Sequence, residues 1–226
     1  MEGLNIVIIG GNSGIGKAIA DRLGEIGANI FLYSKSGRGT TSLDVSREFS
    51  DIPNLPDIID GVVYCPGTIN LKPFHRISIP EFQEEMEVNF FGAVRVLQAC
   101  LKGLKKSSQA SVVLFSTVAV QTGMGFHAGI SSAKGAVEGL VRSLAAEWAP
   151  SGIRVNAVAP SLTDTPLAEK ILSSPEKVEA SAKRHPLGRV GSPEDISEAA
   201  LFLLSGKSSW VTGQVFHVDG GMSVLK

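Results

Sequence analysis

The chain has 226 residues, of which 43% are hydrophobic and 19% charged, a balance typical of a folded globular protein. Lys and Arg number 21 against 22 Asp and Glu, and this near-neutral sequence without a basic run argues against nucleic acid as a partner. The first apolar run, 4–9, is too short for a membrane span or a secretory signal, so we expect a cytoplasmic protein with no membrane partner. The two cysteines have no metal-ligand spacing, and we expect reduced thiols and no metal site.

Short apolar runs alternate with longer segments of helical period along the whole chain. The predicted strands are 4–9, 29–33, 41–43, 61–65, 111–115, 153–158 and 214–218. The predicted helices are 14–26, 80–104, 131–149, 165–184 and 193–205. Strands that are apolar along their length and flanked by helices indicate a parallel sheet covered on both faces. No linker or internal repeat divides residues 1–226, so we predict a single doubly wound α/β domain.

The connection after the second strand is shorter than a usual crossover. Only residues 34–43 separate this strand from Asp44, whereas a crossover between parallel strands usually takes a dozen residues or more. We therefore expect a loop here in place of a helix. Pro53 and Pro56 similarly limit any helix that precedes Gly61.

A glycine-rich turn follows the first strand and opens the first helix. Gly10 permits the tight turn, Gly14 lets the backbone approach a pyrophosphate, and Gly16 lets helix and strand pack closely. Glycines in such a turn can be purely structural, but the strand–turn–helix context favours a dinucleotide-binding site in a Rossmann-type fold, with backbone N–H groups facing the phosphates. The residues expected to contact the dinucleotide here are Gly10, Asn12, Ser13, Gly14, Ile15 and Gly16.

The end of the second strand bears on the choice of dinucleotide. An acid there suits the ribose 2′-hydroxyl of NAD, whereas a basic residue suits the 2′-phosphate of NADP. The segment 33–38 has no carboxylate and offers Ser34, Lys35 and Arg38, which favours NADP(H) over NAD(H). A lysine and an arginine in a surface loop are otherwise simply solvated. Asp44, with Val45 beside it, follows the third strand and is expected at the adenine edge.

Further motifs occur in order along the chain and make it resemble the short-chain dehydrogenase/reductase family over essentially its whole length. They are the turn 10–16, Asn89 within 87–92, Lys134 within 131–137, and the segments 145–150, 153–160, 188–195 and 212–221. One such motif is a weak signal, but this many in order are specific. The resemblance implies hydride transfer between a nicotinamide cofactor and a small carbonyl or alcohol, in a homodimer or homotetramer.

The resemblance also implies roles for individual residues. Lys134 would hold the nicotinamide ribose, Asn89 would order a water for proton relay, and Thr117 would polarise the carbonyl. The dinucleotide contacts expected elsewhere in the cleft are Cys65, Gly67, Asn89, Lys134, Pro160, Thr163 and Thr165. From the sequence itself, residues 161–189 are expected to form a lid over the substrate, helical over 165–184 with breaks at Pro166, Pro175 and Pro186; a simple helical excursion at the surface is the alternative.

One catalytic position departs from the family pattern. The family's tyrosine lies four residues before the lysine, and this chain has Ile130 there, a side chain that neither donates nor accepts a proton. His127 is a candidate donor because an imidazole titrates near neutral pH, although a lone loop histidine is more often structural. Tyr64, and a shifted register that turns Ser131 or Ser132 inward, are further alternatives.

Three functions are consistent with these residues. The first is an NADP-dependent oxidoreductase with an atypical or missing proton donor, favoured by the lid and by the retained Lys134, Asn89 and Thr117. The second is a non-catalytic dinucleotide-binding sensor or partner subunit. The third is a structural subunit with a decayed cofactor site, to which Ile9 and Pro66 would point. An apolar or aromatic substrate is expected from a pocket lined by Val118, Ala119, Met124, Phe126, Ile130 and Leu162.

Overall fold

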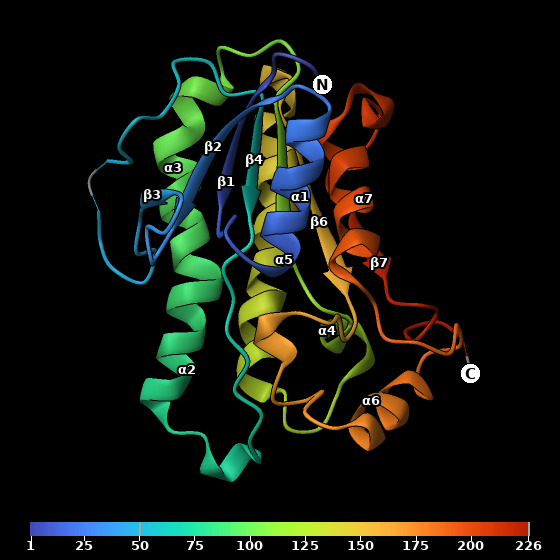
Figure 1. Ribbon diagram of the computed structural model, residues 1–226. Helices are drawn as coiled ribbons and strands as arrows, with labels where there is room; N and C mark the ends of the chain where they lie inside the picture. Colours follow the sequence, from blue (N-terminus) through green and yellow to red (C-terminus); the bar gives the residue numbers. More distant parts are fainter. Residues whose placement is uncertain (50, 226) are drawn as a thin grey trace.

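In a computed structural model of the chain, which describes residues 1–49 and 51–225, seven strands form one sheet in the order β3-β2-β1-β4-β5-β6-β7 (Figure 1). The strands are β1 (Asn5–Ile9), β2 (Asn29–Ser34), β3 (Thr41–Ser42), β4 (Gly61–Tyr64), β5 (Ser111–Phe115), β6 (Arg154–Pro160) and β7 (Val215–Val218). All neighbours pair in parallel, which confirms the predicted doubly wound Rossmann-type sheet. The strand order reverses between β1 and β4, where ligands of such sheets bind beyond the carboxyl ends of the strands.

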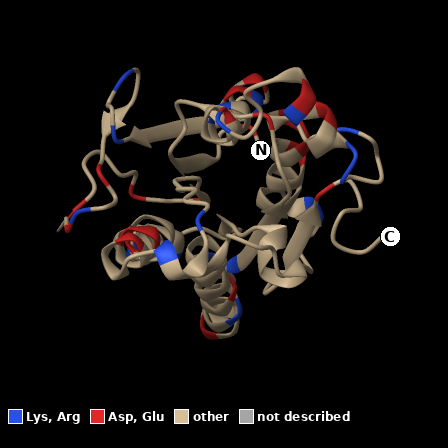
Figure 2. Cartoon of the chain, turned by 90° about the horizontal axis from the view of Figure 1, so that it is seen from below, with Lys and Arg blue, Asp and Glu red and all other residues tan. Residues whose placement is uncertain are grey.

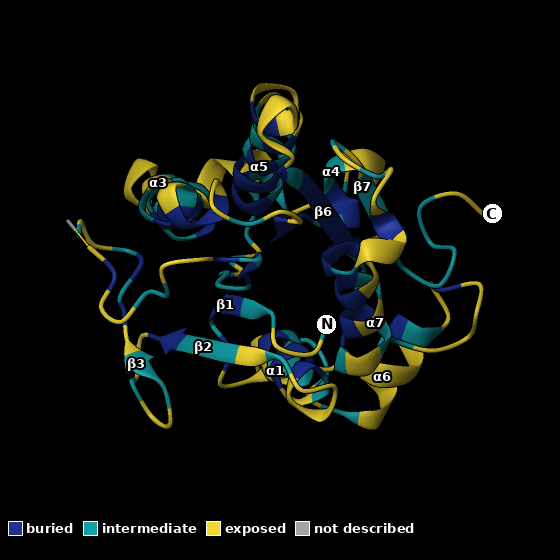
Figure 3. Ribbon diagram, turned by 90° about the horizontal axis from the view of Figure 1, so that it is seen from above, coloured by how far each residue is buried: buried dark blue, intermediate teal, exposed yellow. Residues whose placement is uncertain are grey.

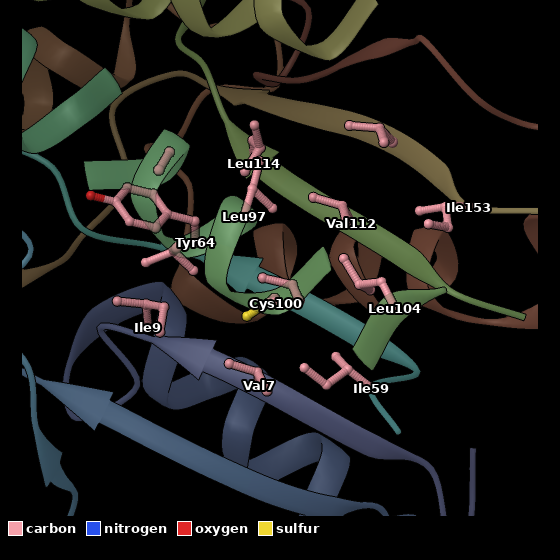
Figure 4. Packing of buried hydrophobic residues seen from close by; sticks show 14 of the residues in the cluster. Val7, Ile9, Ile59, Tyr64, Leu97, Cys100, Leu104, Val112, Leu114 and Ile153 are labelled. Atoms are coloured by element: carbon pink, nitrogen blue, oxygen red, sulfur yellow. The ribbon is translucent and has the colours of Figure 1, made fainter. Parts of the chain in front are cut away.

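Helices cover both faces of the sheet because alternate strand residues point to opposite sides. Val7 and Ile9 pack into a core with α3 (Gly92–Leu104) and α5 (Ala128–Trp148). Ile6 and Ile8 pack into a second core with α1 (Gly14–Glu25) and α7 (Pro193–Leu204). Figure 3 shows the buried strands between these two helical layers, and Figure 4 shows side chains of the first core.

The connection from β2 to β3 contains no helix, as predicted from its length. Tyr33 pairs with Thr41 and Ser34 with Ser42, so a short loop joins two parallel neighbours directly. The loop turns at Gly37, which has a φ of +65°. Because no helix fills this side of the sheet, the carboxyl end of β2 stays open beside the glycine-rich turn.

The predicted helix 80–104 is continuous in direction but changes its geometry in the middle. α2 (Ile79–Met86) begins with a capping box between Ser78 and Glu81, and a π-helical turn, η2 (Glu87–Phe91), joins it to α3. Such π turns widen a helix locally and occur frequently at functional sites. Here the turn contains the fully buried Asn89.

The predicted helical segment 165–184 is interrupted in the structure at two of its predicted breaks, Pro166 and Pro175. The structure has a 3₁₀ turn, η4 (Pro166–Ala168), and a separate short helix, α6 (Pro175–Ala182), whose cap is Ser174. Each element starts at a proline, because proline lacks the N–H that a helix interior requires. The sequence prediction also missed α4 (Val118–Thr122) and placed the start of α5 three residues late. Ile130 therefore lies in the first turn of α5. Further 3₁₀ turns are η1 (Phe74–Arg76), η3 (Ala149–Ser151) and η5 (Gly206–Ser208).

Lysines and arginines alternate with aspartates and glutamates around the outer helices and loops (Figure 2). This mixed pattern accords with the net charge of −1. Among the residues that the structure describes, no helix combines the length and the apolar character needed to cross a membrane.

Candidate functional site

The glycine-rich turn between β1 and α1 has the geometry that the sequence predicted. Gly10 has a φ of +80°, a left-handed conformation that favours glycine. A methyl group added to Gly16 would lie 2.2 Å from the Gly10 carbonyl oxygen, so only glycine fits there. Ser13 caps α1 without a side-chain hydrogen bond to the helix. The N–H groups of the first turn are therefore free of a side-chain acceptor, which suits a phosphate ligand.

A groove of about 980 Å³ runs from this turn along the carboxyl ends of the strands. It is lined by residues that the sequence analysis assigned to the dinucleotide, namely Gly10, Asn12, Ser13, Gly14, Ile15, Gly16, Ser34, Lys35, Asp44, Val45, Cys65, Gly67 and Thr165. The groove adjoins a cavity of about 220 Å³, and Ile15, Cys65, Gly67 and Thr165 line both. An extended ligand thus has a continuous path from the glycine turn into the cavity.

The outer end of the groove is polar and partly cationic. Ser34 is buried, and its hydroxyl lies 2.6 Å from that of Thr40. The Lys35 ammonium lies 3.2 Å from the Asp44 carboxylate and is largely exposed. Arg38 does not line the groove, whereas Ser36, which the sequence analysis passed over, does. Ser36 accepts a hydrogen bond of 2.9 Å from the Asn12 amide, which ties the glycine turn to the end of β2.

The cavity brings together all five predicted catalytic positions: Asn89, Thr117, His127, Ile130 and Lys134. They come from η2, from the start of α4 and from the first turns of α5. Segments distant in sequence therefore meet at the inner end of the groove. Pro160 and Thr163, predicted to lie near the nicotinamide, line the same cavity.

Ile130 is only 5% exposed and forms part of the cavity wall. The helix register is therefore not shifted, and Ser131 and Ser132 do not line the cavity. Tyr64 is not a replacement donor either, because its hydroxyl donates a 2.5 Å hydrogen bond to the Val88 carbonyl within the core (Figure 4). Burial also raises the pKa of Tyr64 far above its usual value. Its contact instead fixes the π turn that carries Asn89.

Ser116 and Thr117 follow the end of β5, and their hydroxyl groups differ in whether the proton is free to be donated to a ligand. Ser116 donates to Glu138 at 2.7 Å, so its proton is already engaged. The Thr117 oxygen accepts from the Ala119 N–H at 3.3 Å as the cap of α4, and its proton remains available. Thr117 is therefore the hydroxyl at this end of β5 that can donate to a carbonyl oxygen in the cavity.

Lys134 is 7% exposed and forms no ion pair within 4 Å with any residue in 1–49 or 51–225. Burial lowers the pKa of Lys134 to about 8, although Cys65 and Glu85 act in the opposite direction. The Asn89 Oδ1 atom is also buried, with no partner among the described residues. A methyl group at Gly67 would lie 3.2 Å from this oxygen and 3.8 Å from the Lys134 nitrogen. The Asn89 Oδ1 atom and the Lys134 ammonium therefore face the same small space. A ligand with hydroxyl groups in this space could form hydrogen bonds with both.

His127 caps α5 and lines the cavity, with its Nδ1 atom 2.7 Å from the Gly125 carbonyl oxygen. In the neutral ring this contact requires Nδ1 to carry the proton, so Nε2 is an acceptor. A neutral His127 therefore presents no proton to the cavity from Nε2.

The segment 161–189 covers the inner end of the groove. Residues of this segment that line the cavity are Ser161, Leu162, Thr163, Thr165, Leu167, Ala168, Ile171 and Arg184. The base of the segment is fixed by the buried His185, whose ring bonds the Ser161 hydroxyl at 2.8 Å and the Ser181 carbonyl at 2.8 Å. The segment lies over the cavity and is held through His185 near both of its ends.

The cavity wall is mostly apolar, as predicted, but its composition differs in detail. Val118, Met124 and Leu162 line it, whereas Ala119 lies in the core and Phe126 is 61% exposed. The sequence analysis also missed several lining residues, among them Thr68, Ile69, Leu71, Leu167, Ile171, Arg184 and Met222. Most of these come from loops whose folding back over the sheet has no local sequence signal.

A second group that the sequence analysis missed is the carboxyl of Glu85. It is 2% exposed and lies one helical turn before Asn89. The spacing of four residues was a usable signal, because it places an acid on the same helix face as a residue predicted to be catalytic.

Comparisons with known proteins identify the family. Residues 40–223 match the family model described as enoyl-(acyl carrier protein) reductase. The chain is 32% identical over 246 residues to 3-oxoacyl-(acyl-carrier-protein) reductase FabG of Aquifex aeolicus, covering 98% of each protein. It is 38% identical over 171 residues to inactive 2-(S)-hydroxypropyl-CoM dehydrogenase 2 of Xanthobacter autotrophicus, covering 74% of each. A solved structure of an ElxO variant with NADPH bound has a TM-score of 0.86 at 25% identity, covering 98% of this chain and 99% of that one. The chain belongs to the short-chain dehydrogenase/reductase family of NAD(P)-dependent oxidoreductases.

Proposed function

We propose that the protein transfers a hydride between NADP(H) and a small, largely apolar carbonyl or alcohol, without the family's tyrosine. The observation that carries this proposal lies where the groove meets the cavity. The Asn89 Oδ1 atom is buried without a partner among the described residues, and the Lys134 ammonium close to it forms no ion pair within 4 Å there. A decayed structural subunit would have no reason to keep an unpaired ammonium in its interior, because burial of the charged form is costly.

The residues present fit a nicotinamide dinucleotide along the whole groove. The N–H groups at the start of α1 would hold the pyrophosphate, and Lys134 would bind the ribose hydroxyls beside Gly67. The bound dinucleotide supplies or accepts the hydride. Thr117 would donate a hydrogen bond to the substrate oxygen, and the cover 161–189 would exclude water from the cavity.

The preference for NADP(H) rests on Ser34 and Lys35, which line the outer end of the groove. No carboxylate lies in 33–38, and a 2′-phosphate there would replace Asp44 as the partner of the Lys35 ammonium.

The experiment that tests the proposal is a calorimetric titration of the chain with NADPH and with NADH. We expect NADPH to bind at least about 10-fold more tightly, and Lys35→Glu to remove that preference. Arg38→Glu is the matched control, because Arg38 is in the same loop but does not line the groove. If neither dinucleotide binds, the proposed function is wrong.

A second candidate function is a non-catalytic dinucleotide-binding subunit. It is favoured by Ile130, an apolar side chain that fills part of the cavity wall, and by a relative that is itself named inactive. Such a subunit would bind NADPH without oxidising it in the presence of any ketone, which separates it from the enzyme.

We propose that the protein forms a homodimer or homotetramer through α3 and α5. Phe91 at the start of this region is 45% exposed, whereas Leu97 is buried in the core. Phe90, Leu140 and Leu144 are partly buried against the same core. Sedimentation of the parent chain and of Phe91→Lys tests this proposal, and we expect the variant to sediment as a smaller species.

A further inference from the structure

A carboxyl group is buried beside the position where the family's tyrosine is missing. Glu85 is the one residue of α2 that is buried, with 2% of its surface exposed. A methyl group at Gly129 would lie 3.4 Å from the Glu85 Cγ atom, so the side chain packs against α5 next to Ile130. An acid buried at this place costs solvation free energy, and an apolar residue would fill it more cheaply.

Glu85 reaches the cavity through a hydroxyl group. Its Oε2 atom is 2.7 Å from the Thr68 hydroxyl and 3.2 Å from the Asn89 amide nitrogen. The same amide nitrogen lies 2.8 Å from the Thr68 hydroxyl, and Thr68 lines both the groove and the cavity. The Oε1 atom of Glu85 has no partner among the described residues. The side chains of Glu85, Thr68 and Asn89 therefore contact one another. Of these three residues, Thr68 and Asn89 line the cavity and Glu85 does not.

The charges around Glu85 favour a carboxyl that holds its proton more readily than an exposed one. Burial raises the pKa of Glu85, and the neighbouring Glu84 on α2 acts in the same direction. The hydrogen bond from Thr68, the nearby Asn70 backbone and Lys134 on α5 oppose this rise. Lys134 is not within ion-pair distance of Glu85, so it tunes the acid without neutralising it.

We propose that Glu85 stores the proton that the substrate oxygen receives, and that the Thr68 hydroxyl delivers it in place of the missing tyrosine. This inference rests on the proposed hydride transfer. Glu85 acts through Thr68 and does not touch the substrate, so its role is to supply and position the proton.

The hydrogen-bonding capacity of Thr68 permits this route. A hydroxyl donates one hydrogen bond and accepts two. When Glu85 is protonated, the Thr68 oxygen accepts from Glu85 and from Asn89, and its own O–H is left for the cavity. When Glu85 is ionised, the Thr68 O–H turns back to Oε2 and the donor is withdrawn. The protonation state of Glu85 therefore controls whether a donor faces the substrate.

The step balances in the direction of reduction. The hydride from the nicotinamide forms the new C–H bond, and the carbonyl carbon is reduced by two electrons while the nicotinamide is oxidised. The carbonyl oxygen takes the proton of Thr68, and Thr68 takes the proton of Glu85. The resulting carboxylate recovers a proton from solvent before the next turnover, and alcohol oxidation follows the same route in reverse.

The other polar groups of the cavity are less suited to this role. The neutral ring of His127 offers only an acceptor at Nε2, since Nδ1 is engaged by Gly125. Thr117 has an available O–H but no acid bonded to it that would replace a donated proton. It polarises the carbonyl without resupplying a proton.

The test compares Glu85→Gln and Thr68→Val with two controls, Glu147→Gln and Thr122→Val, by calorimetric binding of NADPH and by single-turnover reduction of acetophenone. Glu147 is an exposed acid of α5 that lines neither the groove nor the cavity, and Thr122 is the exposed end of α4. We expect both test variants to bind NADPH within about 3-fold of the parent and to lose at least about 100-fold in hydride transfer. The double variant should be no slower than either single one, because both residues serve one route.

A readout independent of turnover separates proton storage from a structural role. In protein labelled with ¹³C at the glutamate carboxyl, with NADPH bound, the signal that Glu85→Gln removes should titrate above the range of the exposed glutamates. The rate of the parent should fall as pH rises through that midpoint, and the fall should be absent in Glu85→Gln. Glu85→Leu should reduce acetophenone as slowly as Glu85→Gln does and should unfold at a higher temperature than the parent. This result would exclude misfolding as the cause of the lost activity.

The outcomes distinguish the inference from the proposed function. If NADPH binds and acetophenone is reduced, but Glu85→Gln and Thr68→Val stay within about 3-fold of the parent, the inference is overturned and the function stands. A Glu85 signal within the range of exposed glutamates overturns the inference in the same way. Failure of the parent to bind NADPH, or to reduce acetophenone while NADPH is bound, overturns the proposed function and this inference with it.

Discussion

The two halves of the cleft differ in how far they keep the pattern of the family. In the groove, the turn is fixed by backbone geometry, since Gly16 has no room for a methyl group beside the Gly10 carbonyl. In the cavity, Ile130 lies where the resemblance places the family's tyrosine, and a buried acid, Glu85, lies against the same turn of α5. A dinucleotide site of this kind depends on the path of the chain. The proton transfer that we propose would depend on a few side chains and would need no change of fold.

The largest expected effect lies in the groove. Gly16→Val places a side chain against the Gly10 carbonyl, displaces the turn and should weaken NADPH binding at least about 100-fold by calorimetry. Gly139→Val is the control, because a side chain at Gly139 on α5 meets open space. Equal NADPH affinity in Gly16→Val and the parent would show that the dinucleotide does not use this turn.

In the cavity, Thr117→Val should lower the rate of acetophenone reduction about 100-fold with little change in NADPH affinity. The variant keeps the shape of the side chain but removes the O–H that polarises the carbonyl. Thr122→Val, at the other end of α4, should be unchanged in a stopped-flow assay. An equal loss in both variants would point to a general disturbance of α4.

Lys134 lies where the groove meets the cavity. Lys134→Met should therefore change both the stability of the folded chain and its affinity for NADPH. Because burial lowers the pKa of Lys134 to about 8 from 10.5, the unfolded chain binds more protons than the folded one between these values. The stability of the parent should therefore rise with pH across this interval. At pH 7 the variant should be more stable by about 3 kcal/mol, and this gain should disappear near pH 10.5.

Urea denaturation at several pH values measures this difference, with the exposed Lys102→Met as a control that should show no pH-dependent gain. The same Lys134→Met variant should bind NADPH about 10-fold more weakly at pH 7, because a charged donor to the ribose is lost. A variant less stable than the parent at pH 7 would mean that the ammonium is compensated within the folded chain.

The smallest expected effect concerns His127. Its ring nitrogen Nδ1 is engaged by the Gly125 carbonyl, so His127→Phe should change the rate of acetophenone reduction by less than about 3-fold. A loss comparable to that of Thr117→Val would restore the histidine as the proton donor and argue against Glu85.

The sequence predicted the groove better than the cavity, for a physical reason. The glycine turn, Lys134 and the strands depend on short-range spacing and alternation, which a sequence displays directly. Glu85, Thr68 and Gly129 come from three separate segments that meet only after α2 packs against α5. In the segment 165–184, the predicted breaks at Pro166 and Pro175 coincide with the starts of η4 and α6, because the effect of proline on a helix start is local in sequence.

The most direct test of the central claim is single-turnover oxidation of bound NADPH by acetophenone, followed by nicotinamide fluorescence as a function of pH. We predict that the parent oxidises NADPH despite Ile130, at a rate that falls as the pH rises through the pKa of one group, and that Glu85→Gln shows no such fall. Bound NADPH that remains unoxidised at every pH would contradict it and leave a non-catalytic dinucleotide-binding subunit.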